Sequence, residues 1–223
     1  MKKNLFLEAI LKFLLGVILV GLLIFLPAGT LRFFGGWLLM AVLFVPMFLA
    51  GLVMLKKNQN LLRSRLDAKE KRAEQDLMVK LSGLMFIAGF VVAGLDFRFG
   101  WLPLPAWVNW VSAALFLIAY MLYAEVLREN AYLSRTIQVQ EGQKVVDTGL
   151  YGIVRHPVYS ATLLLFLAIP LVLGSAISFL CFLAYPVLIA SRIRDEEKLL
   201  EAELPGYKAY QKKVKYRLIP GIW

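Results

Sequence analysis

The chain contains one cysteine, Cys181, and one histidine, His156, among its 223 residues. A single cysteine excludes an intrachain disulfide, and it has no partners for a cysteine-based zinc site. We therefore expect no metal site, and we interpret Cys181 as a small core residue.

Charged residues are also scarce. They make up 18% of the chain, whereas 60% is hydrophobic and the mean hydropathy is +0.70. A soluble domain is nearer 45–50% apolar, so a soluble helical bundle is excluded. Six apolar runs reach or approach the roughly 20 residues that cross a bilayer; they are residues 5–26, 34–55, 77–95, 107–127, 158–173 and 176–190. The first run is too long for a signal peptide core, and we expect no cleavage after it.

Acidic residues are outnumbered, with 15 Asp and Glu against 25 Lys and Arg. In a soluble protein the net charge of +10 would indicate nucleic acid, but its distribution favours a membrane surface. With the N-terminus inside and six crossings, every basic residue except Lys12, Arg32 and Arg98 falls on the inner side or its flanks. This positive-inside pattern predicts that both termini and the polar segments are cytoplasmic. We expect contact with anionic lipid headgroups and no nucleic-acid partner.

The predicted fold is an all-α integral membrane protein with about six transmembrane helices and cytoplasmic amphipathic helices. The last two runs, each roughly 24 Å long, predict a short hairpin with its turn at Gly174-Ser175. Residues 56–76 are either an amphipathic helix on the membrane surface or a solvated connector. We expect one integrated membrane domain, with transmembrane helices in 1–129 and a connector, the hairpin and an amphipathic tail in 130–223. The alternation at 137–140 is typical of a strand and residues 141–143 indicate a turn, so we expect two short extended pieces in the connector and no proper sheet.

Two polar clusters flank this hairpin. The first is GLYGIVRHPVY, residues 149–159, in which Pro157 suits the first position of a helix. The second is RIRDEEKLL, residues 192–200. Because a hairpin returns the chain to the side from which it started, we predict that the two clusters lie together.

The clusters combine three binding chemistries. Arg155 and the adjacent helix start favour an anion, because a helix N-terminus carries partial positive charge. Glu196 and Glu197 favour a cation such as an ammonium group, and Tyr151 and Tyr159 can hold a flat ring. S-adenosylmethionine is one ligand that carries a carboxylate, an ammonium and an adenine.

Read as a pattern, TGLYGIVRHPVY at 148–159 followed by EEKLL at 196–200 resembles the signature of the isoprenylcysteine carboxyl methyltransferase and phospholipid methyltransferase membrane family. The tail GYKAY at 206–210 and the later Ile219-Pro220 are also similar. The resemblance covers the chain from about residue 130 onward. Two positions depart from the family pattern, which has proline at Leu150 and glycine at Ala161.

The resemblance implies a membrane methyltransferase that uses S-adenosylmethionine and acts on a lipid-like acceptor entering between membrane helices. It implies that the cofactor site is lined by Tyr151, His156, Pro157, Tyr159 and Glu196, with Glu196 at the amino group. The implied catalytic residues are Arg192, facing the acceptor, with Glu197 and Arg155.

The acceptor stays open between a carboxylate and an amine. A carboxylate needs no base, and Arg192 or Arg155 could hold it. A protonated amine must first lose a proton to a glutamate or to His156. The partners predicted are membrane lipids and this hydrophobic acceptor.

Two other functions are weighed against the methyltransferase. One is an NADPH-dependent membrane reductase related to sterol reductases. The other is a non-enzymatic membrane protein, although transporters place ionisable groups at mid-membrane and this chain gathers them at the cytoplasmic ends. A bacterial or archaeal cell membrane is the expected location.

Overall fold

The computed structural model describes residues 5–66, 73–130, 132–133 and 139–223. Within these ranges the chain forms helices and no β-strand; an isolated bridge joins Pro103 to Ser175. The elements are α1 (Leu5–Ala28), α2 (Phe34–Lys57), α3 (Gln59–Leu66), α4 (Ala73–Phe99), α5 (Ala106–Glu129), the 3₁₀ turn η1 (Gly149–Gly152), α6 (Pro157–Leu173), α7 (Ala176–Phe182), α8 (Ala184–Glu203) and α9 (Tyr207–Lys213). The predicted all-α class is confirmed.

Five stretches are long and apolar enough to cross a bilayer. They are α1, α2, Asp76–Phe99 of α4, α5, and the stretch Ala176–Glu203 that α7 and α8 form together. Helix α6 is apolar but has 17 residues, or roughly 25 Å at 1.5 Å per residue, which is less than a full crossing of about 30 Å. These helices confirm an integral membrane protein.

The prediction of a hairpin with two short arms is confirmed for the first arm and wrong for the second. Its first arm, α6, is short, but its second arm does not end at residue 190 and continues to Glu203. The predicted arm ends at residue 190 because charged residues begin at Arg192. Arg, Glu, Lys and Leu are good helix formers, so the helix runs on past the end of its apolar part.

The turn between the two arms is built as predicted. Gly174 ends α6 in the left-handed conformation at φ +78, and the Ser175 side chain caps α7 by accepting from the Ser178 backbone N–H. The buried carboxylate of Asp96 accepts from Ser175 Oγ and, at 2.7 Å, from the Leu102 backbone N–H. This polar cluster joins the end of α4 to the turn at one end of the bundle.

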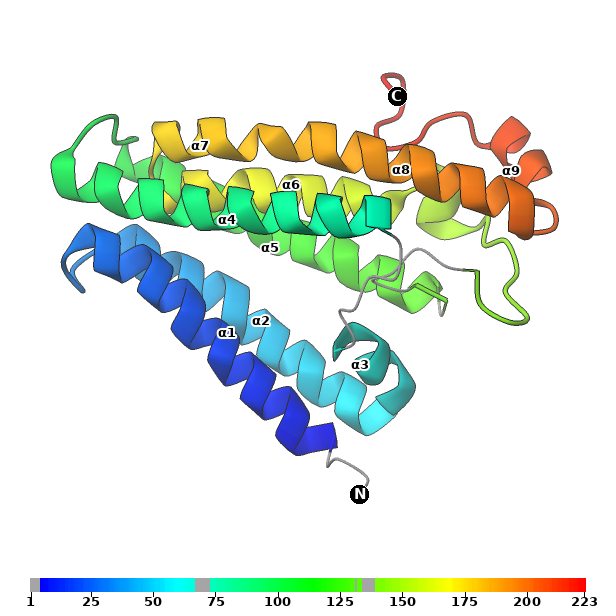
Figure 1. Ribbon diagram of the computed structural model, residues 1–223, viewed down its shortest axis with the longest axis horizontal. Helices are drawn as coiled ribbons and strands as arrows, with labels where there is room; N and C mark the ends of the chain where they lie inside the picture. The colour runs from blue at the N-terminus through cyan, green and yellow to red at the C-terminus, as the bar shows by residue number, and fades with distance from the viewer. Residues whose placement is uncertain (1–4, 67–72, 131, 134–138) are drawn as a thin grey trace.

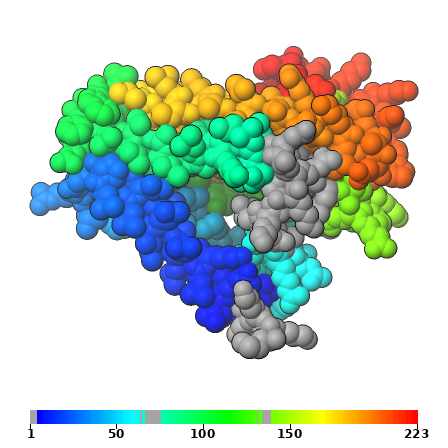
Figure 2. Space-filling view, in the orientation of Figure 1, coloured from blue at the N-terminus to red at the C-terminus, as the bar shows by residue number. Residues whose placement is uncertain are grey.

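Helices α4, α5, α6 and the α7–α8 stretch lie side by side and enclose the core (Figure 1). Its most buried large side chains include Phe116 of α5, Val172 of α6 and Phe182 of α7. Helix α1 meets α4 closely near Ala28, where a Cβ on Gly94 would lie 2.6 Å from the Ile24 carbonyl oxygen. From there α1 and α2 diverge from α8, as the space-filling view also shows (Figure 2).

Residues 56–76 do not form one described helix. Helix α3 covers 59–66 and buries Leu62, which confirms the helical interpretation for that part. Residues 73–76 already belong to α4, and 67–72 lie outside the described residues. In the connector, residues 137 and 138 of the predicted extended segment also lie outside the described residues. Residues 139–140 and those after the turn, 144–147, are described and are not in a strand.

Candidate active site

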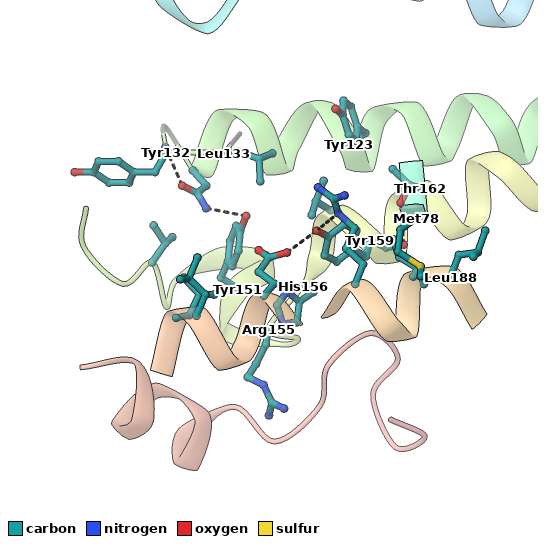
Figure 3. A pocket seen from close by; sticks show the side chains of 18 of the residues that line it. Met78, Tyr123, Tyr132, Leu133, Tyr151, Arg155, His156, Tyr159, Thr162 and Leu188 are labelled. Atoms are coloured by element: carbon teal, nitrogen blue, oxygen red, sulfur yellow. Dashed lines mark hydrogen bonds between the residues drawn. The ribbon is translucent and has the colours of Figure 1, made fainter. Parts of the chain in front are cut away.

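A cavity of about 460 Å³ lies beside the start of α6 (Figure 3). Its wall combines residues of α4, α5, α6 and α8 with the connector, η1 and α9. Toward the middle of the helices the wall is apolar, with Phe86, Phe166 and Ile189. Around the start of α6 it is polar, with Tyr159 of α6 and with Arg192 and Glu196 of α8. The cavity therefore joins a polar chamber to an apolar one.

Local sequence positions the start of α6. Gly149 has φ +54, and a Cβ there would come within 1.6 Å of a Glu129 carboxylate oxygen. That carboxylate accepts from the backbone N–H of Leu150 at 3.0 Å. Since proline has no N–H, the leucine that departs from the family pattern makes this bond possible. Pro157 then opens α6 at the predicted position.

Three predicted residues meet in the polar chamber. The hydroxyl of Tyr159 donates to Glu196 Oε2 and accepts from Arg192 Nε at 3.0 Å. The Tyr159 ring stacks on the ring of His156 with centroids 5.7 Å apart. One acid, one guanidinium and a tyrosine hydroxyl are thus connected on one wall of the cavity.

Tyr151 forms a second polar wall. Its hydroxyl accepts from Asn130 Nδ2 at 2.9 Å, as Figure 3 shows, and its carbonyl oxygen accepts from the hydroxyl of Tyr210 at 2.7 Å. Burial raises the pKa of Tyr151 and that of Tyr210 above their ordinary values. Both phenols therefore stay protonated at neutral pH; in these bonds the Tyr210 hydroxyl is a donor and the Tyr151 hydroxyl is an acceptor.

Glu197 is placed differently from its neighbour. Its side chain is 3% exposed and accepts from Arg155 Nε and from Arg217 Nε, each at 2.7 Å. Its Oε1 lies 3.3 Å from His156 Nε2. The two glutamates thus face different surroundings, and Glu197 is not among the residues that line the cavity.

Arg155 also turns toward the C-terminal tail. Its Nη1 donates to the carbonyl oxygens of Val214 and Lys215, each at 2.8 Å, and its side chain points away from the tyrosines in Figure 3. The backbone N–H groups of Arg155 and His156 donate to the tail as well, to Tyr216 and Arg217 at 2.9 Å. The Arg-His pair therefore anchors the tail against the start of α6.

The structure brings six of the eight predicted site residues into one cavity wall: Tyr151, Arg155, His156, Tyr159, Arg192 and Glu196. Pro157 and Glu197 do not line it. The catalytic role expected of Glu197 stays a prediction. In the structure its carboxylate holds Arg155 and Arg217 and lies beside the His156 ring.

Several lining residues carried no sequence signal. Arg65 reaches the cavity from α3, where its Nη2 donates to the Leu133 carbonyl oxygen at 2.7 Å and its Nη1 to the Tyr123 hydroxyl at 3.3 Å. Gly83 lines the cavity from α4, and Tyr207 lines it from α9. Only Tyr207 lay in a quoted motif, the GYKAY tail. In the described ranges, no three His, Cys, Asp or Glu side chains are grouped as metal ligands would be.

Comparison with known proteins supports the resemblance. Residues 99–202 match the family model of the isoprenylcysteine carboxyl methyltransferase (ICMT) family. The match confirms the resemblance predicted from the motif and extends it upstream of residue 130, through α5. It ends before the GYKAY tail, and α1, α2, α3 and most of α4 lie outside it. The chain is thus similar to a family of membrane methyltransferases over somewhat less than half its length.

Two curated relatives have another activity in their names. The chain is 32% identical to the delta(14)-sterol reductase of Mus musculus over a stretch of 91 residues. This stretch covers 40% of the chain. It is 31% identical over 99 residues, or 41% of this chain, to a probable 7-dehydrocholesterol reductase of Acanthamoeba polyphaga mimivirus. The match spans 22% of the length of each relative.

Proposed function

We propose that the protein is an integral membrane methyltransferase that uses S-adenosylmethionine and methylates a lipid-like acceptor. The observation that carries the proposal is the position of Glu196, an acid in the wall of a cavity that apolar residues of α4, α6 and α8 also line. The similarity of residues 99–202 to the ICMT family supports the same reaction class.

The cavity fits this cofactor by size and by chemistry. About 460 Å³ lies within the range of small-molecule sites, roughly 300–1,000 Å³. Glu196 offers a carboxylate to the ammonium group, and Val145, Leu200 and Leu204 offer apolar surface to the adenine. When bound, S-adenosylmethionine supplies an electrophilic methyl group. The protein then has to align the acceptor and exclude water.

The apolar chamber suits the lipid part of the acceptor. Phe86 of α4, Phe166 of α6 and Leu188 of α8 line it, and Ile189 extends it. These helices are spanning or apolar segments, so a hydrocarbon chain can enter from the membrane while polar ligands reach the other chamber. The arrangement keeps the acceptor tail away from water.

The charges of the wall favour a carboxylate acceptor over an amine. Arg65, Lys144 and Arg192 line the cavity with Glu196 as the acid among its described lining residues. S-adenosylmethionine adds a net positive charge, so an anionic acceptor is attracted and a protonated amine is repelled. An amine would also need a base, but Glu196 accepts from Tyr159 and the His156 ring faces Glu197. We assign Arg192 to holding the acceptor carboxylate.

The distribution of basic residues adds an orientation. We propose that the polar chamber and both termini face the cytoplasm, because most Lys and Arg residues lie in segments at that end. S-adenosylmethionine is then available from the same side. Labelling of single cysteines placed at Gln140 and at Leu102, with a reagent that does not cross membranes, tests this orientation in intact cells or sealed vesicles.

Calorimetric titration of the detergent-purified protein tests the cofactor. The wild-type protein is expected to bind S-adenosylmethionine and S-adenosylhomocysteine, and Glu196→Gln is expected to weaken both. Glu203→Gln is the matched control, because Glu203 is an exposed glutamate on the same helix that does not line the cavity. Equal binding by the two variants would remove Glu196 from the site.

Transfer of a labelled methyl group tests the acceptor. A prenylcysteine-type carboxylate should give a methyl ester, which alkali hydrolyses, whereas an aminophospholipid would give an alkali-stable N-methyl product. Alkali-stable label would overturn the carboxylate assignment and leave the methyltransferase in place.

The sterol reductase relatives favour a second candidate, an NADPH-dependent membrane reductase. Arg65, Lys144 and Arg192 could hold the cofactor's phosphates. NADPH belongs in the same titration for this reason. Binding of NADPH without binding of S-adenosylmethionine would replace the methyltransferase by the reductase.

A further inference from the structure

Tyr207 is a buried tyrosine in the wall of the cavity. It is the first residue of α9, directly after the left-handed Gly206 at φ +87. Its ring is 4% exposed and packs in a small apolar cluster with Leu204, Tyr210 and Val214. Packing in this cluster explains the aromatic ring of Tyr207. It does not explain the hydroxyl group.

The Tyr207 hydroxyl differs from those of the other tyrosines that line the cavity. Its oxygen is buried and has no hydrogen-bond partner among the described residues. The other six each have one, at Tyr123, Tyr132, Tyr151, Tyr159, Tyr185 and Tyr210. A phenylalanine would pack the same cluster without burying an oxygen.

An unmade hydrogen bond at a buried hydroxyl is costly. Leaving such a group unsatisfied costs about 1–3 kcal/mol, so a specific buried polar atom without a partner requires an explanation. Glu197, Glu196 and Arg155 act on it electrostatically, and none of them is hydrogen-bonded to it. Burial, followed by the two glutamates, raises the pKa of Tyr207. The hydroxyl is therefore a buried, neutral donor on a residue of the cavity wall, and it has no acceptor in the described part of the protein.

We propose that the Tyr207 hydroxyl donates a hydrogen bond to an oxygen or nitrogen atom of the bound cofactor, which makes Tyr207 a cofactor-binding residue. This inference rests on the proposed function for the identity of the cofactor. Tyr207 lies outside residues 99–202, so it is contributed by the tail and not by the segment that matches the family model. The tail therefore contributes a residue to the site in addition to packing against the start of α6.

Two phenylalanine substitutions separate a binding hydroxyl from a structural one. Tyr207→Phe is compared with Tyr210→Phe, the matched control in the same cluster, whose hydroxyl donates to the Tyr151 carbonyl oxygen at 2.7 Å. Thermal unfolding of each ligand-free protein in detergent and titration with S-adenosylhomocysteine are measured. Tyr207→Phe should unfold at the wild-type temperature or higher and bind S-adenosylhomocysteine about 3- to 10-fold more weakly. Tyr210→Phe should unfold at a lower temperature.

The outcomes identify which statement fails. If the wild-type protein binds S-adenosylhomocysteine and Tyr207→Phe binds it equally well, the Tyr207 inference is overturned and the proposed function stands. If ligand-free Tyr207→Phe loses as much stability as Tyr210→Phe, the hydroxyl has a partner within the protein and the inference is again overturned. If the wild-type protein does not bind S-adenosylhomocysteine, the proposed function and this inference both fall.

Discussion

Replacement of Glu197 by glutamine should destabilise the protein. Its neighbour Glu196 lines the cavity, whereas Glu197 lies in a buried cluster of charged side chains. The substitution keeps the shape of the side chain and removes its charge. Glu197 is 3% exposed and holds Arg155 and Arg217 at 2.7 Å, with His156 at 3.3 Å. Without the carboxylate, the guanidinium of Arg155, which is 8% exposed, stays buried without its counter-charge.

The expected loss follows from this burial. Removing one partner of a buried ion pair costs about 3–5 kcal/mol, because the remaining charge is left uncompensated. Arg217 is about a third exposed, so solvent screens it and its share is small. We therefore expect the lower bound, about 3 kcal/mol. For a chain of this size that corresponds to an unfolding temperature roughly 6–12 °C lower.

Glu196→Gln is the matched comparison, because it makes the same change one residue earlier. Its carboxylate accepts from Tyr159 in the cavity, and glutamine keeps an acceptor oxygen there. We expect it to lower the unfolding temperature by less than about 4 °C, the equivalent of about 1 kcal/mol. Its main effect should be on cofactor binding. Thermal unfolding followed by tryptophan fluorescence in detergent, with calorimetry below the transition, measures both variants.

The reasoning is refuted by the opposite division of effects. If Glu197→Gln unfolds at the wild-type temperature and loses only methyl transfer, Glu197 contacts the reactants. The buried cluster would then not depend on its charge, and the result would support the catalytic role predicted from the sequence.

Two further substitutions test the apolar chamber and the polar cluster at Asp96. Gly83→Leu should raise the acceptor KM roughly 30-fold and leave S-adenosylhomocysteine affinity unchanged. An added Cβ meets nothing within 4 Å, and the new side chain takes the space of two to three methylene groups of the acceptor, which are worth about 0.8 kcal/mol each. Gly51→Leu, equally open but outside the cavity, is the control, and equal KM values would exclude an acceptor path along α4. Asp96→Ala leaves the buried Ser175 hydroxyl and the part-buried Leu102 N–H without their acceptor and should lower stability by about 2–4 kcal/mol without changing ligand affinity. The exposed Asp76→Ala on the same helix should cost little, and a similar loss in both variants would contradict the role of burial.

The fold was predictable because its main signals are local. Apolar runs gave the membrane helices, Pro157 gave the start of α6, and Gly174 gave the turn after it. That α8 continues unbroken from its apolar part into its charged part was not predictable from hydropathy, because helix formation and membrane crossing stop at different residues. Helix propensity continues through charged side chains, whereas hydropathy falls at the first of them.

The site was predictable only as far as its motif extends. Neighbouring residues on a helix point in directions about 100° apart, so the motif alone does not determine whether Glu196, Glu197 or both face the cavity. Which of them does so depends on Arg217, a tail residue that packs beside Glu197 only in the folded chain. Arg65 was missed for the same reason, since its contacts with Tyr123 and Leu133 span 58 and 68 residues.

The departure at Leu150 shows how one residue changes such a network. Its N–H donates to Glu129, the last residue of α5, and thereby fixes η1 to the end of that helix. A proline at this position has no N–H to donate, although its restricted φ rigidifies the same turn. With leucine at position 150 the turn is held by a hydrogen bond, and with proline it would be held by the fixed φ angle. In proteins that have proline here, we expect the residue at the position of Glu129 to differ.

The two chambers differ in where their residues come from along the chain. The polar chamber is formed largely by residues within 99–202, including Tyr159, Arg192 and Glu196, and the tail adds Tyr207. The apolar chamber receives Gly83 and Phe86 from the part of α4 that lies outside that range. Similarity to the family is therefore informative for the cofactor and much less so for the acceptor. Proteins that share the motif but accept different lipids are expected to differ first along this part of α4.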